Sequence, residues 1–395
     1  MPDAAAGCLL LVDDDKVNRT LMGYYLIQQG HTVVYAENGR QALEILRAQS
    51  VEMMLLDIEM PEMNGYQVLE QVIADPKLRD IPVIVTSGLE EIESVVKCIE
   101  MGAEDYLTKP INQVLLRARI NASLEKKRLR DQQIRLLKQM EEDLEIARQT
   151  QQSILPDHLP EQEGYDFGAR MIPARIVAGD FYGFVQLESD RLGVVIGDVT
   201  DKGLPAALFM ALTYSLVNVV ATLFDSPVDT LAAVNQHLMT MNASSMFVTL
   251  LYGILNYQTG QFRYARAGHL LPVVLDSDGQ AQKINYDLGQ PLGLFNDFAI
   301  DEQNITIPAG GMILLYSDGI SETSNLQGDE FGYQRLHALL AQHRNLPAQV
   351  ICEQLWQAIQ AHSENLQPQD DFTSVVIKRD GPEVNNAKGN IGIYL

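Results

Sequence analysis

The sequence has few cysteines and few basic residues, and each shortage argues against a class of protein. Cys8, Cys98 and Cys352 lie far apart and form no CxxC pair, which argues against a disulfide scaffold or a zinc ribbon and fits a reducing cytoplasm. Lys and Arg number 29 against 52 Asp and Glu, so the formal net charge is −23. Nucleic acid and anionic membrane surfaces would be repelled at long range. We expect neither as a partner.

Targeting and membrane-spanning signals are weak. The first residues have no basic start, and a short apolar run ends at Asp13, so no signal peptide is expected. The stretch 204–224 carries no charge and is long enough to cross a bilayer. It contains polar residues such as Thr213 and Asn218 and has no basic flank on its C-terminal side. These features favour a buried helix of a large core, with a membrane span as the alternative.

Residues 1–122 alternate short apolar runs with helical patterns, which appear for example in 39–47 and 65–74. Such alternation predicts an α/β domain whose parallel sheet is covered by helices on both faces. Functional sites in these sheets lie at the carboxyl ends of the strands. Five runs are expected to be strands, namely 8–12, 31–36, 51–57, 81–87 and 103–110, and their ends hold Asp13, Asp14, Asp57, Thr86 and Lys109.

Three of these strand-end residues are carboxylates that would repel one another without a cation. Oxygen ligands of this kind suit Mg²⁺, and with a metal present one carboxylate can accept a phosphoryl group. Lys109, which precedes a proline, would pair with the new phosphate, and Thr86 would donate a hydrogen bond to it. A single acidic residue at a strand end is usually just solvated. Five suitable residues in order argue against that interpretation.

The region resembles a response-regulator receiver domain over residues 7–122, through LLLVDDDKVNR, LLLDIEMPEMNGYQVL, VIVTS and GAEDYLTKP. The resemblance implies a flavodoxin-like fold with Asp57 as the phospho-acceptor. It also implies a Mg²⁺ site made by Asp14, Asp57 and the backbone carbonyl of Glu59, with Asp13 assisting through water. Thr86, Lys109 and Tyr106 would be the switch residues. No key position departs from the family pattern.

The segment 123–155 is expected to be a helical linker. Glycine is absent from it, and the helical pattern stops at Pro156. Apolar residues recur at alternating steps of three and four, which is typical of a coiled-coil seam. A two-stranded coiled coil that makes the chain a homodimer and a single helix docked on its own domains both remain open. The seam positions are Leu137, Met140, Leu144, Ala147, Gln151 and Ile154.

Residues 156–380 combine strand-like runs with helical blocks at 204–224, 227–241 and 334–362, which suggests a mainly antiparallel α+β domain. A lone Asp-Gly or Gly-Asp is usually a turn, but four aspartate motifs in order, beside apolar strands, favour a metal site. Carboxylates without a His or Cys cluster select Mg²⁺ or Mn²⁺ over zinc. Two such ions can activate water for phosphate-ester hydrolysis. The motifs hold Asp180, Asp198, Asp318 and the pair Asp370–Asp371.

The order PARIVAGDFYG, GDVTDKGLPAALFM, AGHLLP, GQPLGLF, LYSDGISET, FGYQRL and QDDFTSVVI resembles the metal-dependent PPM (PP2C-type) serine/threonine phosphatases over 165–378. Within them it is most similar to the bacterial sporulation-phosphatase group, which acts on anti-sigma-factor antagonists. The resemblance implies two central antiparallel sheets flanked by helices, and two Mn²⁺ or Mg²⁺ ions. Asp198 would bridge both ions, helped by the Val199 carbonyl. Asp180, Asp318 and Asp370 would complete the ligand set.

Some positions depart from that family pattern. Gly183 stands where many relatives carry a second aspartate, and Asp201 stands where glycine is usual. Lys202 replaces the histidine general acid of eukaryotic relatives, so the proton donor to the leaving group is unassigned. Arg175 could bind the phosphate by a bidentate contact or form a surface salt bridge. His269 is expected to be structural.

Together these patterns predict a cytoplasmic, two-component protein phosphatase. A sensor histidine kinase or phosphotransfer protein would phosphorylate Asp57, and the linker would pass the change to the phosphatase. The expected substrate is a phosphorylated anti-sigma-factor antagonist. The alternative is a receiver-gated binding adaptor whose phosphatase-like domain is an inactive scaffold. The final residues, 381–395, are expected to be a tail without function.

Overall fold

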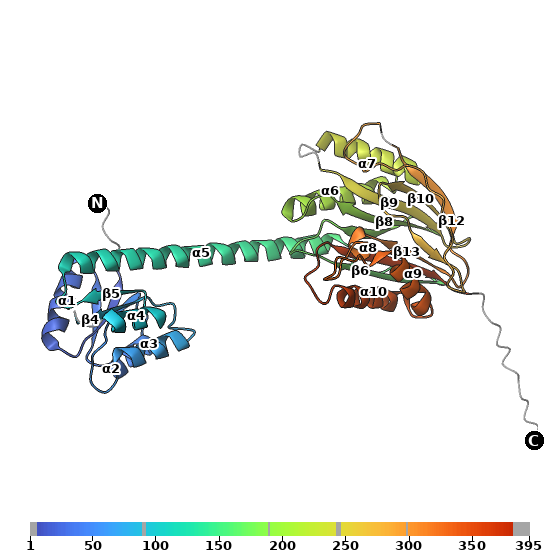
Figure 1. Ribbon diagram of the computed structural model, residues 1–395. Helices are drawn as coiled ribbons and strands as arrows, with labels where there is room; N and C mark the ends of the chain where they lie inside the picture. Colours follow the sequence, from blue (N-terminus) through green and yellow to red (C-terminus); the bar gives the residue numbers. More distant parts are fainter. Residues whose placement is uncertain (1–5, 89–91, 189, 242–245, 298, 382–395) are drawn as a thin grey trace, which may run out of the picture. The chain divides into compact units, whose positions relative to one another are not determined.

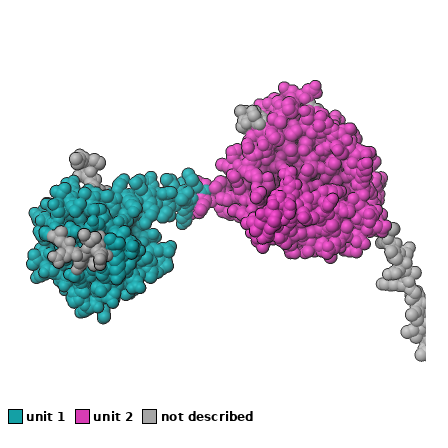
Figure 2. All heavy atoms as spheres, in the orientation of Figure 1, with its two compact units in different colours: residues 1–140 teal, residues 141–395 magenta. Residues whose placement is uncertain are grey.

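The computed structural model describes residues 6–88, 92–188, 190–241, 246–297 and 299–381. The chain divides into two compact units, residues 1–140 and 141–395, which are coloured teal and magenta in Figure 2. The tail expected at 381–395 lies, apart from Gly381, outside the described residues.

The first unit contains a five-stranded parallel sheet in the order β2-β1-β3-β4-β5. The five expected strands are confirmed, each shorter by up to a few residues at its ends. Strands β1 and β3 are buried on both faces because helices cover the sheet on both sides. The strands are β1 (Cys8–Val12), β2 (Thr32–Ala36), β3 (Met53–Asp57), β4 (Val83–Ser87) and β5 (Asp105–Thr108), and the intervening helices are α1 (Lys16–Gln28), α2 (Gly39–Ala48), α3 (Gly65–Ala74) and α4 (Ile92–Glu100).

A single long helix, α5 (Gln113–Ile154), follows β5 and contributes to both units. In its first turns Leu116, Ile120 and Leu124 are buried against the parallel sheet. The middle of the helix is exposed at Leu137 and Met140. Its end belongs to the second unit, where the side chain of Gln151 is buried.

The second unit is built on two antiparallel sheets, as expected. One has the strand order β12-β10-β9-β8-β7 and the other β11-β13-β14-β6. A shared apolar cluster that includes Val194, Leu251, Phe262, Ile313 and Val375 fills the space between them. The strands are β6 (Tyr165–Ile172), β7 (Phe181–Gln186), β8 (Arg191–Val199), β9 (Val248–Asn256), β10 (Gln261–Ala267), β11 (Val273–Leu275), β12 (Asp301–Thr306), β13 (Met312–Tyr316) and β14 (Phe372–Arg379).

Helices cover the outer face of each sheet (Figure 1). Helices α6 (Leu204–Val220) and α7 (Pro227–Met241) pack on the β7–β10 side, where α6 buries Met210, Tyr214 and Val217. Helices α9 (Gly332–His343) and α10 (Ala348–His362) pack on the other sheet, and the short α8 (Asp318–Ser321) follows β13. The result is a four-layer sandwich of helices, two sheets and helices.

The helices of the second unit differ in extent from those expected from the sequence. The single helical block expected at 334–362 is wrong, because α9 and α10 are separated at 344–347, where Pro347 precedes α10. The uncharged stretch 204–224 forms α6, which ends at Val220, and Ala206, Met210 and Val217 are buried in the core. Over the described ranges, no helix combines the length and apolarity that a bilayer crossing requires.

Candidate functional site

The parallel sheet brings Asp13, Asp57 and Lys109 together at the carboxyl ends of β1, β3 and β5. The Lys109 ammonium lies 2.6 Å from Asp57 Oδ2 and 3.0 Å from Asp13 Oδ2, and both carboxylates are almost fully buried. Asp14 is exposed beside them. One carboxylate oxygen each from Asp13, Asp14 and Asp57 lies within 4.8 Å of the others, the only such trio of possible metal ligands among the described residues.

Burial and charge oppose each other at this cluster. Burial raises the pKa of Asp57, and the hydrogen bond from Lys109 only partly offsets it. Burial also lowers the pKa of Lys109, but its bonds to Asp57 and Asp13 outweigh this and leave that pKa raised. One ammonium thus compensates three carboxylates. The donor set and its excess negative charge fit a hard cation such as Mg²⁺, and Asp14 and Glu59 line one hollow beside it.

The two other expected switch residues have different surroundings. Thr86 is buried on β4, and its hydroxyl finds no hydrogen-bond partner in the described structure. Tyr106 on β5 is 36% exposed, and the Arg119 guanidinium of α5 lies 5.5 Å from the centre of its ring. Arg119 also pairs with Asp105. Tyr106 therefore contacts the helix that continues into the second unit.

In the second unit, strand ends from both sheets carry the expected aspartates. Asp180 directly precedes β7, and Asp198 lies near the end of the adjacent β8. Asp318 starts α8 just after β13, and Asp370 precedes the adjacent β14. The two sheets meet here, because Thr373 Oγ1 on β14 donates a 2.6 Å hydrogen bond to Asp180 Oδ2.

Asp180 is the most deeply buried of these carboxylates, at 1% exposure. Burial, together with the nearby charges of Asp198 and Asp371, raises its pKa well above the ordinary range. Its Oδ1 atom is buried with no hydrogen-bond partner in the described structure. An unpaired buried carboxylate oxygen is costly unless a cation binds it, so this atom fits a metal ligand.

Two carboxyl groups near Asp180, those of Asp198 and Asp318, also have raised pKa values. Burial, followed by the charge of Asp318, raises the pKa of Asp198 to about 7. Burial, followed by the charge of Asp370, raises the pKa of Asp318. The Val199 carbonyl faces the same loop, since a Cβ atom added to Gly179 would lie 3.1 Å from its oxygen. Carboxylates that raise one another's pKa values in this way are suited to binding a cation, which offsets their negative charge.

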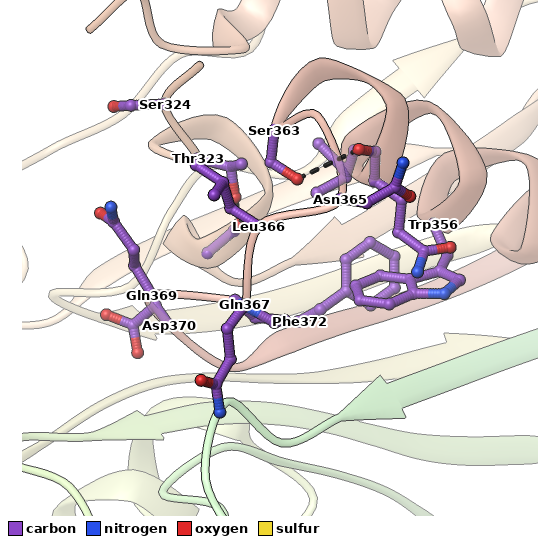
Figure 3. A pocket seen from close by; sticks show the side chains of 14 residues that line it. Thr323, Ser324, Trp356, Ser363, Asn365, Leu366, Gln367, Gln369, Asp370 and Phe372 are labelled. Atoms are coloured by element: carbon purple, nitrogen blue, oxygen red, sulfur yellow. Dashed lines mark hydrogen bonds between the residues drawn. The ribbon is translucent and has the colours of Figure 1, made fainter. Parts of the chain in front are cut away.

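The two adjacent aspartates, Asp370 and Asp371, differ in their contacts. Asp371 accepts hydrogen bonds from the backbone amides of Ala174, Gly179 and Asp180 at 2.7–3.2 Å. Its carboxylate therefore shapes the loop 173–180, although burial raises its pKa. Asp370 is partly exposed and pairs with Lys202 at 2.9 Å. It lies at the edge of a hollow of about 190 Å³ formed with the segment 363–369 and Trp356 (Figure 3).

Arg175 is exposed on the loop 173–180, and its Nη1 atom lies 3.8 Å from the Cβ position of Gly203. No carboxylate in the described ranges lies within 4.0 Å of it, so the expected alternative of a surface salt bridge is absent there. His269 is 4% exposed, its Nδ1 lies 3.0 Å from the Thr249 hydroxyl, and burial lowers its pKa to about 4. Its ring is neutral at pH 7.

The departures from the family pattern have physical reasons. A Cβ atom at Gly183 would lie 2.4 Å from the ring of Tyr214, so the core leaves no room for an aspartate there. Asp201 has φ +69° in the turn before α6, a conformation that glycine adopts most easily but that aspartate tolerates.

Sequence reasoning missed the partners of the aspartates. Gln151, assigned to a coiled-coil seam, instead uses its carboxamide to donate to the Ala178 carbonyl at 2.7 Å and accept from the Ala178 amide at 3.0 Å. Leu155, four residues further along, lies in the apolar core of the second unit. The end of α5 therefore docks on its own domain. A polar residue at an apolar seam position, as Gln151 is, could have indicated that this part of the helix makes polar contacts and does not pair through a seam.

Comparisons with known proteins match both units. The family model for the response regulator receiver domain matches residues 9–121, and that for stage II sporulation protein E matches residues 188–380. The phosphoserine phosphatase RsbU of Bacillus subtilis is 31% identical over 244 residues, 61% of this chain and 71% of that protein. The protein IcfG of Synechocystis is 30% identical over 60% of this chain but only 41% of its own length.

A solved structure shares the fold of the second unit. The SiaA PP2C domain of Pseudomonas aeruginosa superposes with a TM-score of 0.55 at 20% identity, covering 62% of this chain and 99% of that domain. Together with the receiver match, these findings identify a response regulator whose output domain is a phosphatase. The chain belongs to the stage II sporulation protein E family of PP2C-type protein serine/threonine phosphatases and carries a response-regulator receiver domain.

Proposed function

We propose that phosphorylation of Asp57 controls the removal of phosphate from a phosphoserine or phosphothreonine of an anti-sigma-factor antagonist. Two matches support this proposal: the receiver match and the phosphoserine phosphatase named among the relatives. The observation that carries the catalytic part is the buried Asp180 Oδ1 atom, which has no hydrogen-bond partner in the described structure and lies close enough to Asp198 for that charge to raise the pKa of Asp180.

PP2C-type phosphatases generally use Mg²⁺ or Mn²⁺. In this chain Asp180, Asp198, Asp318, Asp370 and the Val199 carbonyl would hold two such ions, which when bound supply a Lewis acid for water and neutralise phosphate charge. Thr373 holds the Asp180 carboxylate in place through its hydroxyl. Asp371 fixes the loop that carries Asp180.

Two cationic side chains near the aspartates would act on the substrate, one by binding its phosphate and the other by donating a proton to the leaving group. Arg175 has no carboxylate partner within the described ranges and can bind two phosphate oxygens through its planar guanidinium. Lys202 is held by Asp370 and by the Gln369 carbonyl. Its ammonium would donate a proton to the leaving serine alkoxide, the role that His269 cannot fill because its ring is neutral at pH 7.

In the receiver, a histidine kinase or phosphotransfer protein would donate the phosphoryl group. An Asp57 carboxylate oxygen attacks the phosphorus, and the imidazole of the donor leaves with the bonding pair. Mg²⁺ would be held by Asp14, Asp57 and the Glu59 carbonyl, with Asp13 assisting. Lys109 would then pair with the phosphate instead of the free carboxylate, and the unpartnered hydroxyl of Thr86 would donate to it.

We further propose three functional segments, 1–122, 123–155 and 156–380, with homodimers forming through the middle one. Exposed apolar residues along α5, among them Leu129, Ile134, Leu137 and Met140, support pairing of two copies. The three unpaired cysteines support a cytoplasmic location. A panel of phosphoproteins tests the substrate: anti-sigma-factor antagonists should lose phosphate faster than unrelated phosphoserine proteins, and equal rates would contradict the assignment.

A further inference from the structure

A second hollow, distinct from the one in Figure 3, is lined by Lys202, which pairs with Asp370, and by part of the loop that leads to Asp180. This linker groove has a volume of about 820 Å³, within the range of ligand-binding clefts. Its walls are mainly apolar and include Leu144, Pro173, Ile176, Leu204, Trp356 and Pro368. The two hollows share Trp356, Gln367 and Pro368. Figure 3 shows Trp356 and Gln367 among the side chains that line the first hollow, together with Asp370.

The linker groove is formed by elements that also build the phosphatase site. Ala174, whose amide bonds to Asp371, and Arg175 belong to the loop that ends at Asp180. Lys202, which pairs with Asp370, and Gly203 belong to the turn after Asp198. A peptide with its phosphate at the aspartates therefore has this groove as the adjoining surface for its neighbouring residues.

The charged and the exposed apolar side chains of the groove indicate which kind of ligand it binds. The chain has a net charge of −23, yet the two charged side chains that line the groove are cations, Arg175 and Lys202. Ile176 and Leu204 are 38% and 46% exposed on its wall. An anionic group flanked by an apolar side chain matches this combination, since the phosphate meets the cations and the apolar side chain covers the exposed wall.

One wall comes from the linker helix itself. Leu144 on α5 lines the groove about two turns before Gln151, which ties the helix to Ala178. A displacement of the end of α5 would therefore alter the groove and the loop 173–180 together.

We propose that the linker groove is a specificity site that binds a leucine-like apolar side chain close to the phosphoserine of the substrate protein, with Leu144 and Ile176 as specificity-determining residues. The inference rests on the proposed phosphatase function and adds a sequence requirement to its substrate. Because Leu144 belongs to the linker helix, this requirement is also open to control by the receiver.

The test uses the full chain with Mn²⁺ and a parent phosphoserine peptide of Gly and Ser, in which one Leu is moved through the positions on either side of the phosphoserine. The specificity constant of each Leu peptide is divided by that of the parent. We expect at least one position to give a ratio of about ten, the size expected when one apolar side chain is partly buried. Ile176→Ser and Leu144→Gln should bring that ratio toward one.

Leu288→Ser is the matched control, because Leu288 is 73% exposed and does not line the groove; it should keep the ratio. A wild-type ratio near one at every position, or a ratio unchanged in both groove variants, would overturn the proposal. Thermal melting identifies a variant that fails to fold, in which case the other groove variant decides. Hydrolysis of para-nitrophenyl phosphate, a substrate without a peptide, tests the phosphatase function separately from the groove. If this compound is not hydrolysed, the phosphatase function fails and the groove proposal fails with it.

Discussion

The carboxamide of Gln151 donates a hydrogen bond to the carbonyl of Ala178 and accepts one from its amide. These two buried bonds join the end of the linker helix to the loop 173–180, two residues before Asp180. The same loop is held from the other side by Asp371. The position of α5 and the position of Asp180, the proposed metal ligand, are therefore coupled through this loop.

Replacing Gln151 with Leu should loosen this connection. The substitution leaves the Ala178 amide and carbonyl buried and unpaired, which costs about 1–3 kcal/mol for each group. We expect the Mn²⁺ concentration for half-maximal phosphatase activity to rise about tenfold. The control is Gln152→Leu, an exposed neighbour on the same turn. An unchanged Mn²⁺ requirement in Gln151→Leu would show that the contact does not position the site.

The hydroxyl of Thr373 should set metal affinity through Asp180. Thr373→Val keeps the shape but removes the 2.6 Å hydrogen bond to Asp180 Oδ2, and loss of such a supporting contact typically weakens metal affinity by about 10–100-fold. Calorimetric titration with Mn²⁺ measures the change, and Thr373→Ser should restore most of the affinity. Equal affinities for the valine and serine variants would refute this role.

The metal-free protein should lose stability as the pH rises. Asp198 has a pKa of about 7 in the fold, above its ordinary value of 3.8, so the folded state binds its proton more tightly than the unfolded state does. The resulting stabilisation is fully present below about pH 4 and is lost as the pH rises through 7. With EDTA, we expect the melting temperature to fall more between pH 5 and 8 in wild type than in Asp198→Asn.

Added Mn²⁺ should make the melting temperature of the wild type fall much less between pH 5 and 8, because the bound ions replace the protons that offset the carboxylate charges. If the melting temperatures of wild type and Asp198→Asn in EDTA fall equally between pH 5 and 8, the raised pKa of Asp198 is contradicted.

Lys109 should act as the counter-ion of the metal-free receiver. Lys109→Ala leaves Asp13 and Asp57 buried without their cation, which is strongly destabilising. We therefore expect Mg²⁺ to raise the melting temperature of Lys109→Ala by several degrees more than that of wild type. The control is Lys126→Ala, since Lys126 is exposed and pairs only peripherally with Glu104. A Mg²⁺ effect of equal size in all three proteins would be inconsistent with this role.

The sequence predicts buried strands better than it predicts polar strands or the contacts of the site residues. The central parallel strands, such as 8–12, are buried and form continuous apolar runs, which the sequence shows directly. The edge strands β2 and β5 are partly exposed. Strand β12 has the sequence DEQNIT, which alternates buried with partly exposed residues and is polar on average, so no apolar run marks it in the sequence. Helices α9 and α10 were merged, since the apolar periodicity continues across Pro347.

The aspartates at the two sites could be named from motifs because their chemistry requires carboxylates at strand ends. What the sequence did not reveal was which carboxylates are structural. Asp370 and Asp371 are adjacent and chemically identical, yet one pairs with Lys202 and the other binds three backbone amides. That distinction depends on contacts between residues about 170 to 200 positions apart along the chain, which no local pattern contains.

The central claim, that Asp57 controls the phosphatase, is tested most directly by phosphate release from a phosphoserine protein with Mn²⁺, with and without beryllofluoride as a mimic of phospho-Asp57. Wild type, Asp57→Ala and Asp198→Asn are compared. We predict that beryllofluoride changes the rate in wild type and leaves Asp57→Ala unaffected, while Asp198→Asn releases almost no phosphate. Rates in wild type that are the same with and without beryllofluoride would contradict the account.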